Sequence, residues 1–323
     1  MTKRPVMGRD ILEEYIPTNG IETYVLHLPE QDAKTVLLYV HGGPGESAVP
    51  FMWFFKRNFG AICSLVTYDQ RGTGRTFRRN PLAKPELSLL LEDLHEVIAH
   101  LKRRYGVEKV ALLGHSWGSG LGSVYALAHP EDLLCYIGVG QLIDGRANEA
   151  TGARRLRELI LEADNKKDLA ALDAIGEYPC GENAPFSWDK IMRVRKLQRK
   201  YGLAVRFSAT FFREMLTSPT LKLRDVLLMK KTFAFNYPMV EWVITSFNLE
   251  AYTRRYETPV FYLLGERDYQ TPYVIATSYF NEIEAPQKEL VLLKNAGHFP
   301  QLDDMPSFVA ALSNILRQLE PSV

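Results

Sequence analysis

The chain has 323 residues, of which 46% are hydrophobic and 24% are charged, a composition typical of a soluble globular protein. A formal net charge of +1 gives no indication of a nucleic-acid partner. No apolar run reaches the roughly 20 residues that a membrane-spanning helix needs. Acidic residues near the start, Asp10, Glu13 and Glu14, occupy the place where a signal peptide would be apolar. We therefore expect a cytoplasmic protein with no membrane span and no nucleic-acid partner.

Strands and helices alternate along the first part of the chain. Asn19-Gly20 supplies the tight turn of a hairpin between its first two strands. Apolar runs with β-branched residues predict strands buried on both faces, whereas an apolar stripe at helical spacing predicts a long helix. The strands are expected at Glu13–Pro17, Ile21–Leu28, Thr35–Val40, Ser64–Tyr68, Lys109–Leu113 and Leu134–Val139, and the helices at Glu86–Tyr105 and Ser119–Ala128.

The pattern changes after Gly140. Residues 144–256 show helical periodicity, many basic residues and no convincing buried strand. Alternation returns with strands at Pro259–Leu264 and Lys288–Leu293 and helices at Tyr273–Ile283 and Pro306–Leu319. This rhythm predicts an α/β fold with a mainly parallel central sheet. We expect residues 1–143 and 257–323 to form the core, and residues 144–256 to form a helical cap inserted at the edge where such sheets bind ligands.

Gly114-His115-Ser116-Trp117-Gly118 is the strongest chemical signal. It lies between a predicted strand and a predicted helix, the setting of a G-x-S-x-G nucleophile elbow in the α/β-hydrolase fold. A serine hydroxyl needs a base within hydrogen-bond reach before it can act as a nucleophile at neutral pH. Ser116 is therefore the predicted nucleophile of a hydrolase.

The acid and base are expected after Ser116, in the order that this fold uses. Asp268 follows the strand at Val260–Leu264, and His298 follows the strand at Leu290–Leu293. We predict His298 as the general base and Asp268 as the acid that orients it. Glu266, two residues before Asp268, is the alternative acid.

Acyl transfer also requires donors for the developing oxyanion. The backbone N–H of Trp117 is one candidate, and the loop His41-Gly42-Gly43-Pro44-Gly45 is expected to supply the other. Gly43 is preferred, with Gly42 as the alternative. No phosphate-binding glycine motif occurs in the sequence, and no cofactor or metal is expected.

Five segments together resemble the proline iminopeptidase family of α/β-hydrolases. They are His41 to Gly45, Asp69-Gln70-Arg71-Gly72-Thr73-Gly74-Arg75, Gly114 to Ser119, Gly265-Glu266-Arg267-Asp268 and Ala296-Gly297-His298. The resemblance covers about two-thirds of the chain. It implies an aminopeptidase that removes an N-terminal residue, often proline, from small peptides without a metal or cofactor, and whose cap carries glutamates that bind the substrate amine.

The predicted cap offers several substrate-binding candidates. Glu214 and Glu241 are candidate amine anchors there, beside Trp242, and Glu46 directly follows the HGGPG loop. The family's Trp-x-x-Trp-Glu cap motif is absent from the sequence. The basic stretch Lys190–Lys200 is interpreted as the solvated face of a cap helix, with a membrane or acidic-partner surface as the alternative.

Two enzyme functions remain open on the sequence alone. An aminopeptidase would require a free amine on its substrate, whereas a carboxylesterase, lactonase or amidase would accept a small apolar ester or amide. A non-catalytic receptor is disfavoured, because a receptor does not need a nucleophile, an acid, a base and two oxyanion donors. Epoxide or haloalkane hydrolysis is disfavoured because it uses a carboxylate where Ser116 stands.

Overall fold

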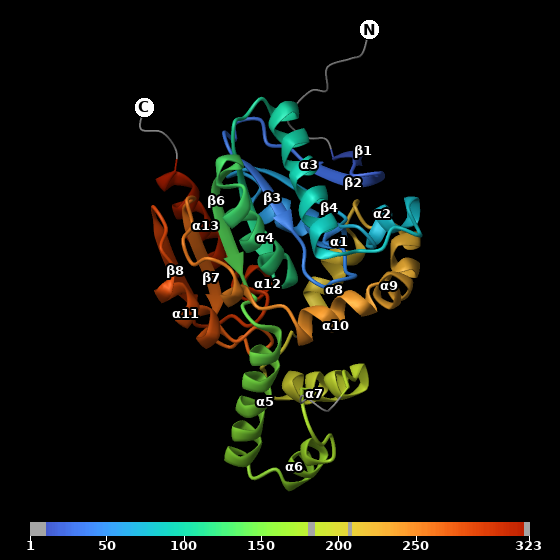
Figure 1. The fold of residues 1–323 in the computed structure, drawn as a ribbon, viewed down its shortest axis with the longest axis vertical. Coiled ribbons are helices and arrows are strands. Elements are labelled where there is room, and N and C mark those ends of the chain that lie inside the picture. The colour runs from blue at the N-terminus through green and yellow to red at the C-terminus, as the bar shows by residue number, and fades with distance from the viewer. Residues whose placement is uncertain (1–10, 180–184, 206–208, 320–323) are drawn as a thin grey trace.

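The computed structural model describes residues 11–179, 185–205 and 209–319, and their strands form one eight-stranded sheet (Figure 1). The strand order is β1-β2-β4-β3-β5-β6-β7-β8. β1 and β2 pair antiparallel at one edge, and every pair from β4 to β8 is parallel. The strands are β1 (Leu12–Thr18), β2 (Ile21–Leu28), β3 (Val36–Val40), β4 (Ser64–Tyr68), β5 (Val110–His115), β6 (Leu133–Val139), β7 (Val260–Gly265) and β8 (Lys288–Leu293).

The predicted α/β architecture is confirmed. Each predicted strand is present within two residues at either end, and the hairpin turns at Asn19 and Gly20, both of which have positive φ. β3, β4 and β5 are buried along their whole length, as expected for strands covered on both faces.

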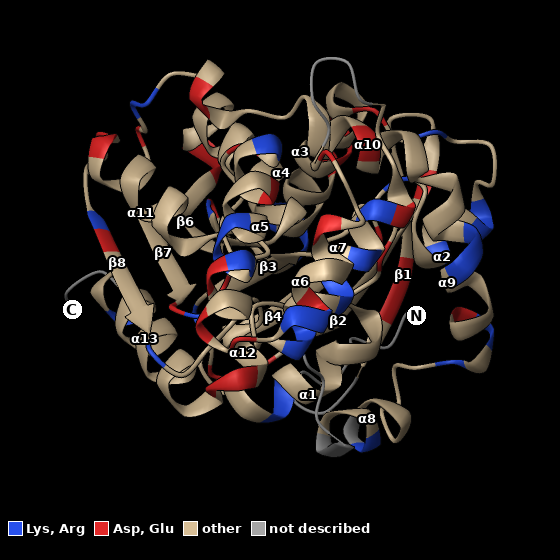
Figure 2. Ribbon diagram, turned by 90° about the horizontal axis from the view of Figure 1, so that it is seen from below, with Lys and Arg blue, Asp and Glu red and all other residues tan. Residues whose placement is uncertain are grey.

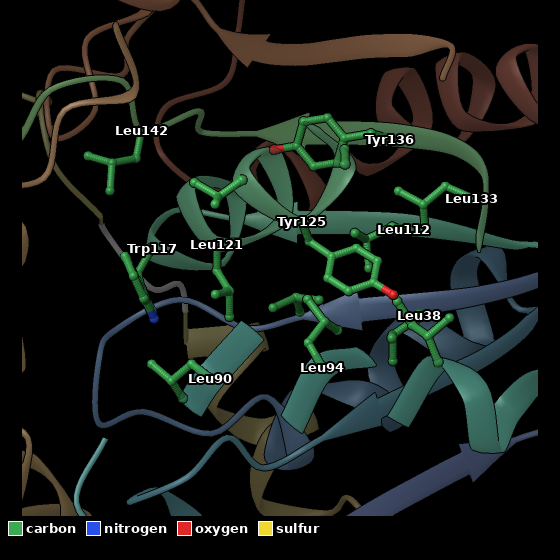
Figure 3. Packing of buried hydrophobic residues seen from close by; sticks show 14 of the residues in the cluster. Leu38, Leu90, Leu94, Leu112, Trp117, Leu121, Tyr125, Leu133, Tyr136 and Leu142 are labelled. Atoms are coloured by element: carbon green, nitrogen blue, oxygen red, sulfur yellow. The ribbon is translucent and has the colours of Figure 1, made fainter. Parts of the chain in front are cut away.

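Helices cover both faces of the sheet. α3 (Leu87–Tyr105), α4 (Trp117–Ala128) and α11 (Tyr273–Glu282) pack on one face, where Leu94 and Leu121 meet Leu38 and Leu112 of the strands (Figure 3). On the other face lie α1 (Val49–Phe59) and α13 (Met305–Gln318). The two resulting apolar cores fix the sheet and therefore the position of the loops at its edge.

Helices also fill the stretch between β6 and β7. The described residues of this stretch contain no strand. α5, α6 and α7 lie together at one end of the molecule, away from the sheet (Figure 1). The helices are α5 (Gly145–Glu162), α6 (Lys166–Asp173), α7 (Trp188–Lys200), α8 (Ala209–Leu216), α9 (Leu223–Phe235) and α10 (Tyr237–Thr245), followed by the short η2 (Leu249–Ala251).

Side-chain hydrogen bonds join the segment that contains α8, α9 and α10 to the first part of the chain. The Asn236 amide donates to the carbonyl of Gly72 at 2.7 Å, and the Thr220 hydroxyl donates to the carbonyl of Val49 at 2.7 Å. The remaining short helices are α2 (Gly74–Arg79), η1 (Pro130–Asp132) and α12 (Pro300–Asp303). Across the described ranges, no helix combines the length and the apolar character that crossing a membrane would require.

Candidate active site

Ser116 occupies a sharp turn between β5 and α4. Its backbone has φ 55° and ψ −123°, a left-handed conformation that residues other than glycine rarely adopt. The turn needs small neighbours: a Cβ at Gly114 would collide with the carbonyl of Gly118, and a Cβ at Gly118 would collide with the carbonyl of Val40. The G-x-S-x-G spacing therefore follows from close packing of β3, β5 and α4, and it presents the serine hydroxyl above the sheet.

Three side chains from separate strand ends form a hydrogen-bonded chain. Nε2 of His298 lies 3.0 Å from Oγ of Ser116, and Nδ1 of His298 lies 2.9 Å from Oδ2 of Asp268. These residues follow β5, β7 and β8, whose carboxyl ends meet at one edge because the strands are parallel. Asp268 makes this contact, and the alternative acid Glu266 does not.

The Asp268 carboxylate is fully enclosed by donors. Oδ1 accepts the backbone N–H groups of Gln270 and Thr271, each at 2.9 Å, and Oδ2 accepts the Thr271 hydroxyl at 2.8 Å in addition to His298. Burial alone would raise the pKa of Asp268, but the interaction with His298 and the hydrogen bonds from Thr271 outweigh it and lower the pKa. Asp268 is thus held as a charged acceptor for the imidazole.

The HGGPG loop lies against Ser116. A Cβ at Gly42 would meet the Cβ of Ser116 at 2.9 Å, and Gly43 has φ +117°, a value that favours glycine. The backbone N–H of Trp117 is the first of α4 and has no carbonyl one turn earlier in the helix. Within the described part of the chain, neither this N–H nor that of Gly43 has a hydrogen-bond partner.

The DQRGTGR segment, residues 69–75, forms hydrogen bonds with this loop. The backbone N–H of Gln70 donates to Nε2 of His41 at 3.1 Å, and the Gln70 amide donates to the carbonyl of His41 at 2.8 Å. The same amide accepts the indole N–H of Trp117 at 3.1 Å. Burial lowers the pKa of His41 to about 4, so this imidazole is neutral and can accept from Gln70. Gln70 therefore links the two segments that flank Ser116.

A cavity of about 860 Å³ opens over Ser116 and His298. This volume lies within the range of small-molecule sites. Apolar side chains from the stretch between β6 and β7 line it: Leu142, Trp188, Ile191, Met192, Val205, Phe233, Val240, Val243 and Ile244.

Of the predicted substrate-binding residues, Glu46 lies in the cavity wall. Glu46 is an exposed residue, although surrounding protein raises the pKa of its carboxyl group against the opposing charge of His298. Glu241 is exposed and Trp242 packs edge-on against Trp117, and neither lines the cavity. Glu214 falls on α8, and its side chain lies outside the described residues.

The cavity also contains polar groups that the sequence analysis did not single out. Asn148 and Glu149 of α5 line it, each less than 5% exposed, and so does Arg195 of α7, which pairs with Glu149. The prediction that the basic stretch Lys190–Lys200 forms a solvated helix face is therefore wrong for Arg195. Figure 2 views these helices from their outer side. Because Glu149 and Arg195 are distant in the sequence and belong to no motif, no sequence signal marked their pairing.

Two clusters of histidine and acidic side chains lie outside the cavity. Glu14, His27 and His100 form one, and His95, His129 and Asp132 form the other. In the first cluster both imidazoles direct Nε2 at the same Glu14 oxygen, each at 2.8 Å. These hydrogen bonds account for the arrangement without an ion.

Comparison with known proteins agrees with this fold. Residues 37–312 match the model of the family described as the alpha/beta hydrolase family. The probable aminopeptidase YbaC of Bacillus subtilis (strain 168) is 25% identical over 289 residues, which cover 87% of this chain and 89% of that protein.

Solved structures show the same fold. The proline iminopeptidase of Mycobacterium smegmatis aligns with a TM-score of 0.71 at 20% identity, covering 95% of this chain and 98% of the other. An esterase of Exiguobacterium antarcticum aligns with a TM-score of 0.57 at 16% identity, covering 95% and 100%. Since the family model spans most of the chain and the fold agrees, this protein belongs to the alpha/beta hydrolase family.

Proposed function

We propose that the protein is a serine aminopeptidase that releases N-terminal residues from small peptides. Ser116 is the nucleophile, His298 the general base, and Asp268 the acid that orients the imidazole. The observation that carries the proposal is the hydrogen-bonded chain from Asp268 through His298 to Ser116 beneath a cavity. The similarity to aminopeptidases and proline iminopeptidases gives further support.

The reaction proceeds in two halves. The Ser116 hydroxyl attacks the carbonyl carbon of the first peptide bond while Nε2 of His298 takes its proton. The carbon–nitrogen bond then breaks, and His298 gives this proton to the departing amine. Water attacks the resulting ester of Ser116 with His298 again as base, which releases the N-terminal amino acid and restores the hydroxyl.

The backbone N–H groups of Gly43 and Trp117 stabilise the negative oxygen of the tetrahedral intermediate. Both lack a partner within the described part of the protein, and both residues line the cavity together with Ser116. Donors held in place before the reaction stabilise a developing oxyanion without reorganisation.

Glu46 is the proposed anchor for the substrate amine. It directly follows the HGGPG loop. Its carboxylate interacts electrostatically with His298, so it lies near the reaction centre. No hydrogen bond or ion pair to Glu46 is found among the described residues, so its charge is available to an ammonium group. Glu149, in contrast, is already engaged by Arg195 and by the Tyr178 hydroxyl.

In this proposal residues 144–256 form a cap that closes over the substrate, and the apolar wall from α7, α9 and α10 contacts the side chain of the departing residue. The cytoplasmic location expected from the sequence stays a prediction, which cell fractionation tests.

A carboxylesterase or amidase acting on small apolar substrates is the second candidate. The apolar cavity wall favours it, and an esterase shares the fold. The two candidates share the nucleophile and differ in whether the substrate needs a free amine.

Hydrolysis of proline and alanine p-nitroanilides, measured beside short-chain p-nitrophenyl esters, separates the two. Ser116→Ala serves as the blank. We expect release of p-nitroaniline from the free-amine anilides. Cleavage of the esters alone would move the protein to the esterase function, and turnover by Ser116→Ala at the wild-type rate would refute the nucleophile.

A further inference from the structure

One side of the cavity is built from the first helices after β6. From α7, residues Trp188, Ile191, Met192, Arg195 and Arg199 line it at helical spacing, so one face of this helix is turned to the cavity. From α5, Asn148 and Glu149 face the same space. This wall therefore combines an apolar surface with a small set of polar groups, the usual composition of a specific binding site.

Arg195 lies in this wall, and several of its N–H donors have no hydrogen-bond partner among the described residues. One terminal nitrogen donates to Glu149, and the other donates to the Gln198 amide at 2.7 Å. A guanidinium has five N–H donors, and no partner for the other three is found among the described residues. Glu149 is fixed in turn by the Tyr178 hydroxyl. The ion pair therefore positions Arg195 while part of its donor fork stays unused.

Asn148 is the second unsatisfied group. The residue is 3% exposed, and neither its amide nitrogen nor its amide oxygen has a hydrogen-bond partner among the described residues. A buried polar group without a partner destabilises the fold, and such groups are rare in folded proteins. Asn148 lines the cavity beside Glu149, so a ligand in the cavity is the natural source of the missing partner.

The charge of this wall is positive. Glu149 and Arg195 offset one another, while Arg199 of this wall and Lys230 of α9 line the cavity without an ion pair in the described ranges. The cavity lining also includes Glu46, which leaves an excess of one positive charge among its Lys, Arg, Asp and Glu side chains. Arg195 also interacts electrostatically with Asp268, so it lies near the reaction centre. An additional cation in the substrate would be repelled here, whereas an anion would be attracted.

We propose that the cavity binds a carboxylate of the substrate through Arg195 and Asn148, with Arg199 and Lys230 reinforcing the positive field. This inference rests on the proposed aminopeptidase function and narrows its substrates to short peptides that carry a carboxylate close to the cleaved bond. The planar donor fork of arginine matches the two oxygens of a carboxylate. The carboxylate is either the C-terminus of a dipeptide or an acidic side chain on the released residue.

Binding to the full-length Ser116→Ala protein, measured by calorimetry, tests the inference without turnover. Alanyl-alanine is compared with its C-terminal amide, and glutamyl p-nitroanilide with glutaminyl p-nitroanilide. We expect the acid of at least one pair to bind about tenfold or more tightly than its neutral partner, as a charge-assisted hydrogen bond would give. The first pair identifies a C-terminal carboxylate, and the second identifies an acidic side chain.

Variants in the same Ser116→Ala background assign the effect. Arg195→Met is combined with Glu149→Gln, so that no buried charge is left unpaired. Asn148→Leu removes the amide that has no partner in the protein, so it should not lower the melting temperature. Both changes should reduce the preference for the acid, whereas Arg193→Met should keep it, because Arg193 lies on α7 outside the cavity.

Equal binding of acid and amide in both pairs, or a preference that survives the Arg195→Met and Glu149→Gln pair of changes, would overturn the inference. Failure of both acids to bind would overturn it as well. Turnover of alanine p-nitroanilide by the wild-type enzyme is measured separately. It decides the proposed function whatever the outcome of the binding experiment.

Discussion

Thr271 offers a direct test of how Asp268 is positioned. Its hydroxyl donates to Oδ2 of Asp268 at 2.8 Å, the same oxygen that lies 2.9 Å from Nδ1 of His298. Thr271→Val keeps the shape of the side chain and removes the hydroxyl, which also lies 3.1 Å from Nδ1 of His298. Because Asp268 is 1% exposed, water cannot take the place of the lost hydroxyl.

The size of the effect follows from the number of donors. Asp268 accepts four hydrogen bonds, and three remain after the change. A hydrogen bond to a charged group contributes about 1.5–3 kcal/mol, and the remaining three keep the carboxylate in its loop. We therefore expect about 1.4 kcal/mol to appear in the barrier, which is a tenfold fall in kcat, with KM changed less than twofold.

Steady-state kinetics with alanine p-nitroanilide measures both constants. Thr271→Ser keeps the hydroxyl and is the matched control, for which we expect nearly wild-type kcat. Losing the donor also removes one cause of the lowered pKa of Asp268, so the acid limb of the pH–rate profile should change in Thr271→Val and not in Thr271→Ser. Equal kcat in Thr271→Val and wild type, or an equal loss of kcat in both variants, would show that the Thr271 hydroxyl does not position Asp268.

Three further predictions concern the amine site, the elbow and the edge of the sheet. Glu46→Gln should lower kcat/KM for free-amine anilides about 10-fold to 100-fold and leave kcat/KM for esters unchanged. In the wild type, KM for the anilides should rise as the pH falls through the raised pKa of Glu46. Gly118→Ala should cost about 3 kcal/mol in urea unfolding, because its Cβ collides with the carbonyl of Val40; unchanged stability would contradict the packing. The hydrogen bond from His27 is the main cause that lowers the pKa of Glu14 to about 2. Glu14→Gln should therefore lower the free energy of unfolding by about 1 kcal/mol at pH 7, and this difference should vanish as the pH falls from 4.5 through about 2; a difference that grows in acid would contradict it.

The parts of the fold that are read from the sequence are those with a clear local pattern. Buried strands such as β4 appear as continuous apolar runs between turn residues, and α3 appears as an apolar stripe. α1 was not predicted, because Val49 to Phe55 are all apolar or proline and show no separate polar face. A uniformly apolar run does not distinguish a buried helix from a strand.

The candidate site divides in the same way. Ser116, Asp268 and His298 follow strands whose parallel order brings their ends together, so strand assignment and chain order are enough to predict the contact. The helical wall has no such rule. Glu149 and Arg195 meet only because α5 and α7 pack side by side, and that packing depends on tertiary contacts that no short motif records.

The most direct test of the central claim compares alanine p-nitroanilide with its N-acetyl derivative. An aminopeptidase with a carboxylate at the amine site should cleave the free-amine compound at least about 100-fold faster in kcat/KM, because acetylation removes the charge that Glu46 binds. Ser116→Ala should cleave neither compound. Equal cleavage of both compounds by the wild-type enzyme would contradict the proposed aminopeptidase function and identify a hydrolase that does not recognise the substrate amine.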